Sequence, residues 1–161
     1  MTSSKNIKRE DANDGPVSGA ENDHWEPQDT KGYQQKWEEG LPVVFVITPT
    51  YSRHLQRAEL TRLSQTLRLV TNLHWILVED SVSKTSLVTR FLAECGVRYT
   101  HLNTRTNEAY RDYIKKLPRG VDQRNKGLQW LRNAIEPSSV DGVVYFADDD
   151  NVYNIELFEK V

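Results

Sequence analysis

Three consecutive aspartates, Asp148, Asp149 and Asp150, are the residues of this sequence that most directly suggest chemistry. They follow the apolar run Val143–Ala147, which has the length and the β-branched and aromatic content of a buried strand. Three adjacent like charges at the end of a buried strand are costly unless a cation lies among them. Because hard divalent cations prefer oxygen ligands, the cluster predicts a metal site. The plainer alternative is a solvated turn, since Asp and Asn favour turns.

The chain that precedes this cluster alternates between strand-like and helix-like segments. Short apolar runs predict strands over residues 43–48, 74–78 and 97–102, in addition to the run before the aspartates. Apolar residues at helical spacing predict helices over residues 53–70, 85–95 and 121–135, and a further helix from residue 154. This alternation predicts an α/β fold with a Rossmann-like, mainly parallel sheet and flanking helices.

Polar residues follow three of the predicted strands, namely Pro49-Thr50-Tyr51, Glu79-Asp80 and the aspartate cluster. Right-handed crossovers bring the carboxyl ends of parallel strands to one edge of the sheet, which is where open α/β sheets bind ligands. We therefore expect these three polar segments to lie near one another. No glycine-rich turn follows the first strand, so a dinucleotide-binding Rossmann motif and a P-loop are both excluded.

A nucleotide could be held at this edge by other means. Tyr51 offers a ring face for a base, and Asp80 offers an acceptor for a base N–H or a ribose hydroxyl. A metal on the aspartates would bind a diphosphate, and the guanidinium groups of Arg119 and Arg124 match phosphate oxygens. Each residue also has a plainer explanation: packing for Tyr51, a helix cap or turn for Asp80, and ordinary surface charge for the arginines.

Composition narrows the class of protein. The chain has 161 residues and a formal net charge of −2, so no basic field points to nucleic acid. Residues 1–40 are polar and predict a disordered, stem-like linker, and residues 41–161 predict one domain. No stretch approaches the roughly 20 apolar residues of a membrane span, and no signal peptide follows Met1.

Four motifs in this order resemble the β-1,3-glucuronyltransferase family: Pro49-Thr50-Tyr51, residues 74–80 (HWILVED), residues 118–128 (PRGVDQRNKGL) and residues 144–151 (VYFADDDN). The resemblance covers residues 41–161. It implies a GT-A fold and a manganese-dependent, inverting enzyme that transfers glucuronic acid from UDP-glucuronate to a galactose-terminated glycan. That is the reaction of a galactosylgalactosylxylosylprotein 3-beta-glucuronosyltransferase, as in the proteoglycan linker tetrasaccharide.

The resemblance also implies roles for individual residues. It places Pro49, Thr50 and Tyr51 around the uracil and ribose, and Asp80 on the uracil. It assigns Arg119 and Arg124 to the uridine or diphosphate, Asp148 and Asp149 to hydroxyls of the donor sugar and ribose, and Asp150 to the manganese ion.

The sequence departs from the family's pattern in two places. The family's general base is a glutamate expected beyond Val161, so we expect the domain to be incomplete at its C-terminus. The family is also a type II Golgi membrane group, a possible homodimer at full length, with an N-terminal anchor that residues 1–40 lack. Two alternatives follow: a non-catalytic UDP- or UDP-sugar-binding fragment without acceptor site and base, and a magnesium-dependent phosphohydrolase.

Overall fold

A single parallel sheet organises the part of the chain that the structure describes. This computed structural model describes residues 35–107, 119–135 and 140–160. The strands are β1 (Val43–Thr50), β2 (Leu73–Glu79), β3 (Tyr99–Asn103) and β4 (Gly142–Phe146). The helices are α1 (Gln56–Leu67), α2 (Ser86–Glu94), α3 (Val121–Ala134) and α4 (Glu156–Glu159). The predicted α/β fold with a mainly parallel sheet is therefore confirmed, and β1 runs two residues further than the sequence predicted.

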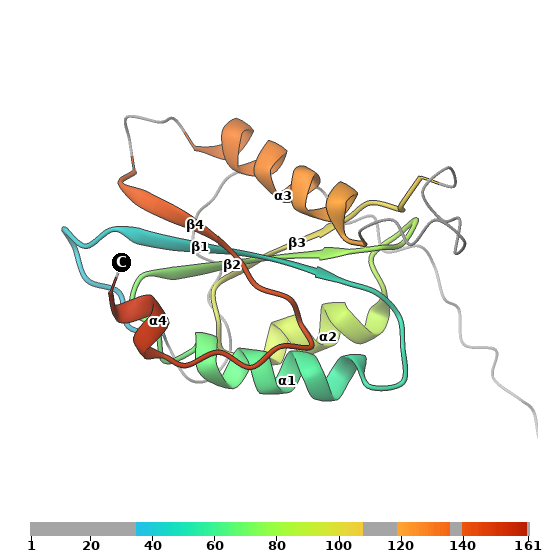
Figure 1. Cartoon of the computed structure of the whole chain (residues 1–161), viewed down its shortest axis with the longest axis horizontal. Coiled ribbons are helices and arrows are strands. Elements are labelled where there is room, and N and C mark those ends of the chain that lie inside the picture. Colours follow the sequence, from blue (N-terminus) through green and yellow to red (C-terminus); the bar gives the residue numbers. More distant parts are fainter. Residues whose placement is uncertain (1–34, 108–118, 136–139, 161) are drawn as a thin grey trace, which may run out of the picture.

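The helices cover both faces of the sheet (Figure 1). On one face, α1 and α2 pack on inward-pointing strand residues, and a leucine stripe on α1 forms the centre of that core. On the opposite face, α3 places Trp130 and Leu131 against Phe45, Ile47 and Ile76. The two cores leave β1 and β2 buried along nearly their whole length. Near-continuous apolar runs are what a strand covered on both faces requires.

Successive strands are added first on one side of β1 and then on the other, while all strands remain parallel. The sheet order is β3-β2-β1-β4, so the chain first builds outward from β1 through β2 to β3. It then crosses the other face through α3 and adds β4 on the opposite side of β1 (Figure 1). Such a reversal is the topological switch point at which open α/β sheets form a crevice beyond the carboxyl ends of their strands. The ends of β1 and β4 flank this point.

Strand β4 differs from its predicted environment. The sequence predicted a buried strand, but Val143, Val144 and Phe146 are 37%, 44% and 43% exposed. The reason is its place in the sheet: β4 pairs with β1 along one edge only, and no described strand pairs with its other edge. Apolar composition shows that a strand is suited to burial, but it does not supply the neighbour that buries it. The edge strand is therefore an apolar, unpaired surface within the described residues.

Residues 35–40 contact the sheet layer, although they lie in the segment predicted to be a linker. The Gln35 side chain donates to the backbone oxygen of Val70 over 2.7 Å and accepts from the backbone N–H of Arg98 over 3.2 Å. The Asn72 amide donates to Glu38 O over 2.7 Å. These contacts add residues 35–40 to the folded unit, and residues 1–34 lie outside the described residues. No helix in the described ranges is long and apolar enough to cross a membrane.

The buried ring of His74 links stability to pH. It stacks on Trp130 with ring centroids 5.7 Å apart and lies 2.9 Å from the Thr100 hydroxyl. Burial, assisted by the charge of Arg98, lowers the pKa of His74 from 6.5 to about 4. The unfolded chain therefore binds this proton more tightly. The stability contributed by neutral His74 is fully present above pH 6.5 and is lost as the pH falls toward 4.

We predict that His74→Gln reduces the pH dependence of stability between pH 7 and pH 5. In the unsubstituted chain, protonation of this residue should cost about 2 kcal/mol of unfolding free energy at pH 5. Urea unfolding at both pH values measures the difference. His54→Gln, at an exposed position, provides the control substitution of the same type. Equal pH dependence in all three chains would contradict the role assigned to His74.

Helix α3 approaches β1 closely because residue 127 is glycine. A Cβ at Gly127 would lie 2.8 Å from Cγ2 of Ile47, which is a branched and buried side chain that cannot easily move away.

We predict that Gly127→Ala lowers the unfolding free energy by about 1 kcal/mol, because overpacking outweighs the gain in helix propensity. Chemical denaturation measures it. Gln129→Ala, on the exposed side of the same helix, should change stability by less than about 0.5 kcal/mol. Equal or greater stability of Gly127→Ala would show that α3 has room to adjust.

Candidate functional site

The site is built where β1 and β4 separate at their carboxyl ends. Pairing between the strands ends with Ile47 opposite Phe146, and the next N–H, that of Ala147, donates to Ile47 O over 3.1 Å. Beyond this point the Thr50 hydroxyl donates to Oδ2 of Asp149 over 2.6 Å. Two of the polar segments that the sequence predicted to meet are therefore in direct contact.

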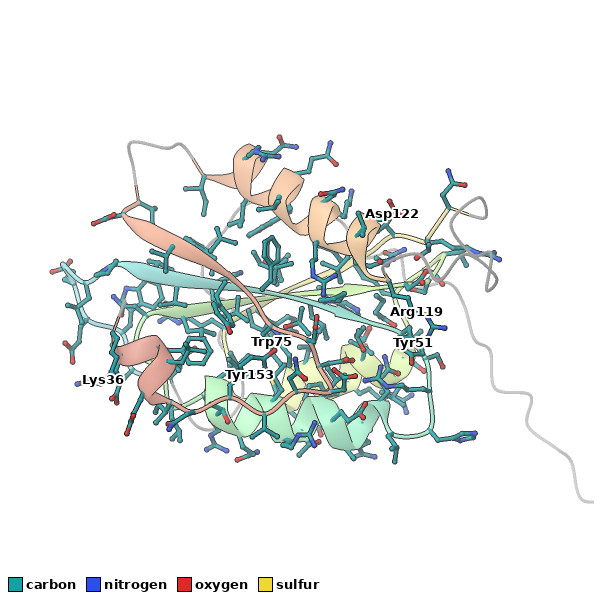
Figure 2. All side chains as sticks on the ribbon, in the orientation of Figure 1. Lys36, Tyr51, Trp75, Arg119, Asp122 and Tyr153 are labelled. Atoms are coloured by element: carbon teal, nitrogen blue, oxygen red, sulfur yellow. The ribbon has the colours of Figure 1, made fainter. Side chains whose placement is uncertain are left out.

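Asp148 is paired with an arginine from α3. Nη2 of Arg124 forms an ion pair with Oδ1 of Asp148, and Nη1 donates to the backbone oxygen of Arg119 over 3.0 Å. The backbone N–H of Asp148 donates to the hydroxyl of Tyr153 over 2.7 Å, which holds the loop after β4. Figure 2 shows Arg119 and Tyr51 at the same end of the sheet. Both predicted arginines thus belong to the predicted edge, and one of them contacts the aspartate cluster.

Gly120, at the start of α3, allows the chain to approach β1. Its φ angle is +79°, in the left-handed region that glycine adopts at low cost. A Cβ at this position would lie 2.8 Å from Nη1 of Arg124 and 3.0 Å from Cβ of Pro49. The glycine therefore brings Pro49 and the two arginines together.

Asp149 is turned into the protein. It is only 5% exposed, and its two oxygens have different partners. Oδ2 accepts from the Thr50 hydroxyl, while Oδ1 lies 2.8 Å from Nη2 of Arg53 in an ion pair. The resemblance implied a direct contact between Asp149 and donor hydroxyls. Here both of its oxygens already bind groups of the protein, so such a contact would have to share them.

Asp150 has the opposite orientation. It is exposed, and its carboxylate makes no hydrogen bond or ion pair with another described residue. Its backbone oxygen accepts from Nη2 of Arg62 over 2.6 Å, so the loop is held while the side chain remains open to solvent. An exposed carboxylate at a switch point fits a hard divalent cation, which would complete its shell with water and ligand oxygens. No group of three His, Cys, Asp or Glu side chains in the described ranges could hold a metal by protein ligands alone.

The three aspartates of the predicted metal site have different partners in the structure. Asp148 and Asp149 are neutralised by Arg124 and Arg53, and only Asp150 projects outward without a protein partner among the described residues. The electrostatic repulsion among adjacent carboxylates at the strand end is offset largely by the guanidinium groups of these arginines. A metal ion is thus compatible with the cluster, but the charge of the cluster alone does not require one.

Tyr51 and Asp80 form a second part of the site. The Tyr51 ring is 43% exposed, so packing alone does not account for it, and the guanidinium carbon of Arg53 lies 4.6 Å from its centroid. The Asp80 carboxylate accepts from the backbone N–H and the hydroxyl of Thr106, each over 2.7 Å. The Asp80 N–H donates to Thr50 O over 2.7 Å, which ties the end of β2 to the end of β1. Asp80 is held in a fixed orientation by these contacts, and it does not cap α2, whose N-cap is Thr85.

Glu79, the neighbour of Asp80, is not part of the open site. It is buried, and its carboxylate accepts from the N–H and hydroxyl of Thr85 over 2.9 and 2.7 Å. Nε2 of His101 lies 2.5 Å from Oε1 of the same carboxylate. Glu79 thus fastens the start of α2 and the end of β3 beneath the site, and of the pair at this strand exit only Asp80 is partly exposed.

Sequence reasoning missed two residues that organise the site. Arg53 contacts both Tyr51 and Asp149, and Thr106 holds the Asp80 carboxylate. Arg53 lies three residues after the end of β1, and this short distance along the chain could have indicated that its side chain reaches the same edge of the sheet. Thr106 lies in an irregular segment of the sequence, and nothing in its local pattern indicated its partner.

Taken together, these contacts give an edge with one exposed carboxylate, a nearby arginine pair and a half-exposed aromatic ring. Arginine and a cation on Asp150 would favour a phosphate group, and the ring and the Asp80 carboxylate would favour a base with an N–H donor. The arrangement therefore suits a nucleoside phosphate better than a small neutral ligand.

Comparison with known proteins identifies the family of the chain. Residues 63–161 match Glycosyltransferase family 43. The chain is 51% identical over 132 residues to Galactosylgalactosylxylosylprotein 3-beta-glucuronosyltransferase 1 of Pan troglodytes, which covers 78% of this chain and 39% of that protein. It is also 51% identical over 122 residues to the corresponding enzyme 2 of Homo sapiens, covering 75% of this chain and 37% of that protein.

The same similarity extends to the corresponding enzyme 3 of Mus musculus, which is 51% identical over 138 residues, covering 76% of this chain and 41% of that protein. The chain thus spans about two fifths of the length of each of these relatives. The matched region contains β2 to β4, α2, α3 and the aspartate cluster. The chain therefore belongs to glycosyltransferase family 43, a glucuronosyltransferase family with the GT-A fold.

Proposed function

We propose that this chain is the donor-binding part of a glucuronosyltransferase and binds UDP-glucuronate together with a divalent cation, Mn²⁺. The observation that carries the proposal is the exposed Asp150 carboxylate at the switch point, beside the Arg124–Asp148 pair. Residues 1–40 remain a predicted linker apart from the contacts of residues 35–40, and residues 41–161 form the donor-binding unit.

The nucleoside would lie on the side of Tyr51 and Asp80. The partly exposed Tyr51 ring offers a stacking surface for uracil, and Pro49 and Thr50 border it at the end of β1. Thr106 holds the Asp80 carboxylate at this edge, and a carboxylate is a suitable acceptor for the N–H of the uracil ring. A carboxylate has no donor when ionised, which disfavours a base edge that presents only acceptors.

The diphosphate would lie between α3 and Asp150. Arg119 and Arg124 approach from the start of α3, and Asp150 would hold the cation. When bound, the ion would act as a Lewis acid that neutralises the charge developing on the departing diphosphate. Asp148, already oriented by Arg124, retains lone pairs for hydroxyls of the donor sugar or ribose.

The complete reaction would be an inverting transfer of glucuronic acid to a galactose-terminated glycan, the acceptor that the relatives' names indicate. Such a transfer needs a general base that removes the proton of the acceptor hydroxyl. We assign no described residue to this role, and Glu156 and Glu159 on α4 are not candidates. By similarity to the family, we also propose a Golgi membrane location and a homodimeric full-length protein.

A second candidate is a UDP- or UDP-sugar-binding unit without transferase activity. It is supported by the same donor-site contacts and needs no general base, a role that we assign to none of the described residues. The two candidates share the donor site and differ in whether glucuronic acid reaches an acceptor. A phosphohydrolase would instead cleave simple phosphate esters, and it leaves the exposed Tyr51 ring without a role.

We predict that UDP binds this chain more tightly with Mn²⁺ than with a chelator, and that Asp150→Ala removes the difference. Loss of the carboxylate proposed to hold the cation should weaken Mn²⁺-dependent binding by about tenfold or more, equivalent to roughly 1.4 kcal/mol. Isothermal titration calorimetry measures both states. Asp141→Ala is a matched control, because Asp141 is also exposed but precedes β4 at the opposite end of the strand. Equal loss in both variants, or no Mn²⁺ dependence, would contradict the assignment.

We further predict that the chain does not release inorganic phosphate from p-nitrophenyl phosphate in the presence of Mg²⁺. A transfer assay with labelled UDP-glucuronate and a galactose-terminated disaccharide then separates the two remaining candidates. Labelled product that disappears in Asp150→Ala would establish the transferase. Tight UDP binding without product would establish the binding unit, and phosphate release would support the hydrolase.

A further inference from the structure

Arg53 is the described residue that connects the two halves of the proposed donor site. It lies in the loop between β1 and α1, directly beyond the first strand exit. Its guanidinium group contacts the ring of Tyr51, called the Tyr51 platform below, and the carboxylate of Asp149 in the aspartate cluster. Arg53 thus contacts both Tyr51 and Asp149.

The contact with the aspartates passes through Asp149. Nη2 of Arg53 lies 2.8 Å from Oδ1 of Asp149, while Thr50 donates to Oδ2 over 2.6 Å. Thr50 in turn accepts from Nε2 of the buried Gln56 over 3.0 Å, so the hydroxyl proton is directed at Asp149. Asp149 is therefore clamped on both oxygens. Its neighbours Asp148 and Asp150 are consequently directed away from the interior.

The contact with the platform uses the ring and backbone of Tyr51. The guanidinium carbon lies 4.6 Å from the ring centroid, and Nη1 donates to Tyr51 O over 3.3 Å. Glu59 on α1 forms a further ion pair with Nη2 of Arg53 and so fixes the guanidinium from the helix side. Burial lowers the pKa of Arg53, but Asp149 and Glu59 outweigh this effect and the net pKa is raised, so the group stays charged.

Lysine could not make the same set of contacts. A planar guanidinium presents several N–H donors in fixed directions and stacks on an aromatic face, whereas an ammonium is a compact point charge. Here one group bonds a backbone oxygen, lies over a ring and pairs with two carboxylates. The contacts with the Tyr51 ring and backbone oxygen, in addition to the charge, favour arginine over lysine at residue 53.

We propose that Arg53 is a positioning residue of the donor site, which fixes the Tyr51 platform and the aspartate loop relative to each other. Asp149 is then the internal anchor of that loop, and it acts by orienting Asp148 and Asp150. This inference rests on the proposed function, because it assigns Arg53 to the same nucleotide site. It predicts that base binding and cation-dependent phosphate binding are weakened together when Arg53 is replaced.

The test compares uridine without metal and UDP with Mn²⁺ by calorimetric titration of the full chain. Arg53→Gln should weaken both by about 10- to 100-fold, the range typical when a partner that orients a site residue is removed. Arg53→Lys keeps the positive charge between the two carboxylates, so it is the variant expected to fold most like the original. It should still weaken both ligands. Arg57→Gln, an exposed arginine of α1, should bind both as the unsubstituted chain does.

Two readouts separate positioning from loss of fold. Partial unfolding would lower the apparent number of binding sites and leave the Kd of the folded molecules unchanged, whereas loss of positioning raises the Kd at full stoichiometry. In a double-mutant cycle, Asp149→Asn combined with Arg53→Gln should weaken UDP binding by less than the product of the single effects, because both variants break one contact.

Either of two results overturns the inference. If Arg53→Gln and Arg53→Lys bind uridine and UDP with Kd values within about twofold of the unsubstituted chain, Arg53 has no positioning role. If the two effects with Asp149→Asn multiply, the residues act independently. A failure of the unsubstituted chain to bind UDP overturns the proposed function and this inference together, whereas the first two results leave the proposed function intact.

Discussion

The constraint on which the site depends is the repulsion among three adjacent carboxylates at the end of β4. The protein separates them by supplying arginines from opposite faces of the sheet: Arg53 precedes α1 on one face, and Arg124 lies in α3 on the other. Asp149 is drawn inward, Asp148 is held toward α3, and Asp150 remains exposed. The Arg53–Asp149 pair is largely buried, so removing one of its partners is costly, whereas the Arg124–Asp148 pair is partly exposed.

The topology of the sheet makes that division possible. Because the strand order reverses at β1, the ends of β1 and β4 diverge with α1 on one side and α3 on the other. Gly127 and Gly120 then let α3 approach β1 closely enough for Arg124 to reach Asp148. The reversal of strand order thus places these strand ends side by side, and the two glycines let α3 lie close to them. This edge is where a GT-A enzyme is expected to hold its nucleotide.

Much of this could be predicted from the sequence because the signals were local. Apolar runs located the strands, helical spacing located the helices, and parallel topology required Thr50, Asp80 and Asp149 to share an edge. What could not be predicted was which charge faces which. Adjacent aspartates carry the same sequence signal, yet Asp149 is buried and Asp150 is exposed. The difference arises because Arg53, which is distant in the sequence, pairs with Asp149 and not with Asp150. Similarly, the apolar run of β4 indicated burial, but the exposure of Phe146 depends on a neighbouring strand that no local pattern specifies.

We propose that Asp150 holds the cation, while Asp148 and Asp149 stay paired with Arg124 and Arg53. A crystal structure of the chain with UDP and Mn²⁺ would test this, because the anomalous signal of manganese locates the ion. We expect manganese on the Asp150 carboxylate and the diphosphate, with both arginine–aspartate pairs intact. Manganese shared among the three aspartates, with Arg53 or Arg124 displaced from its partner, would contradict it.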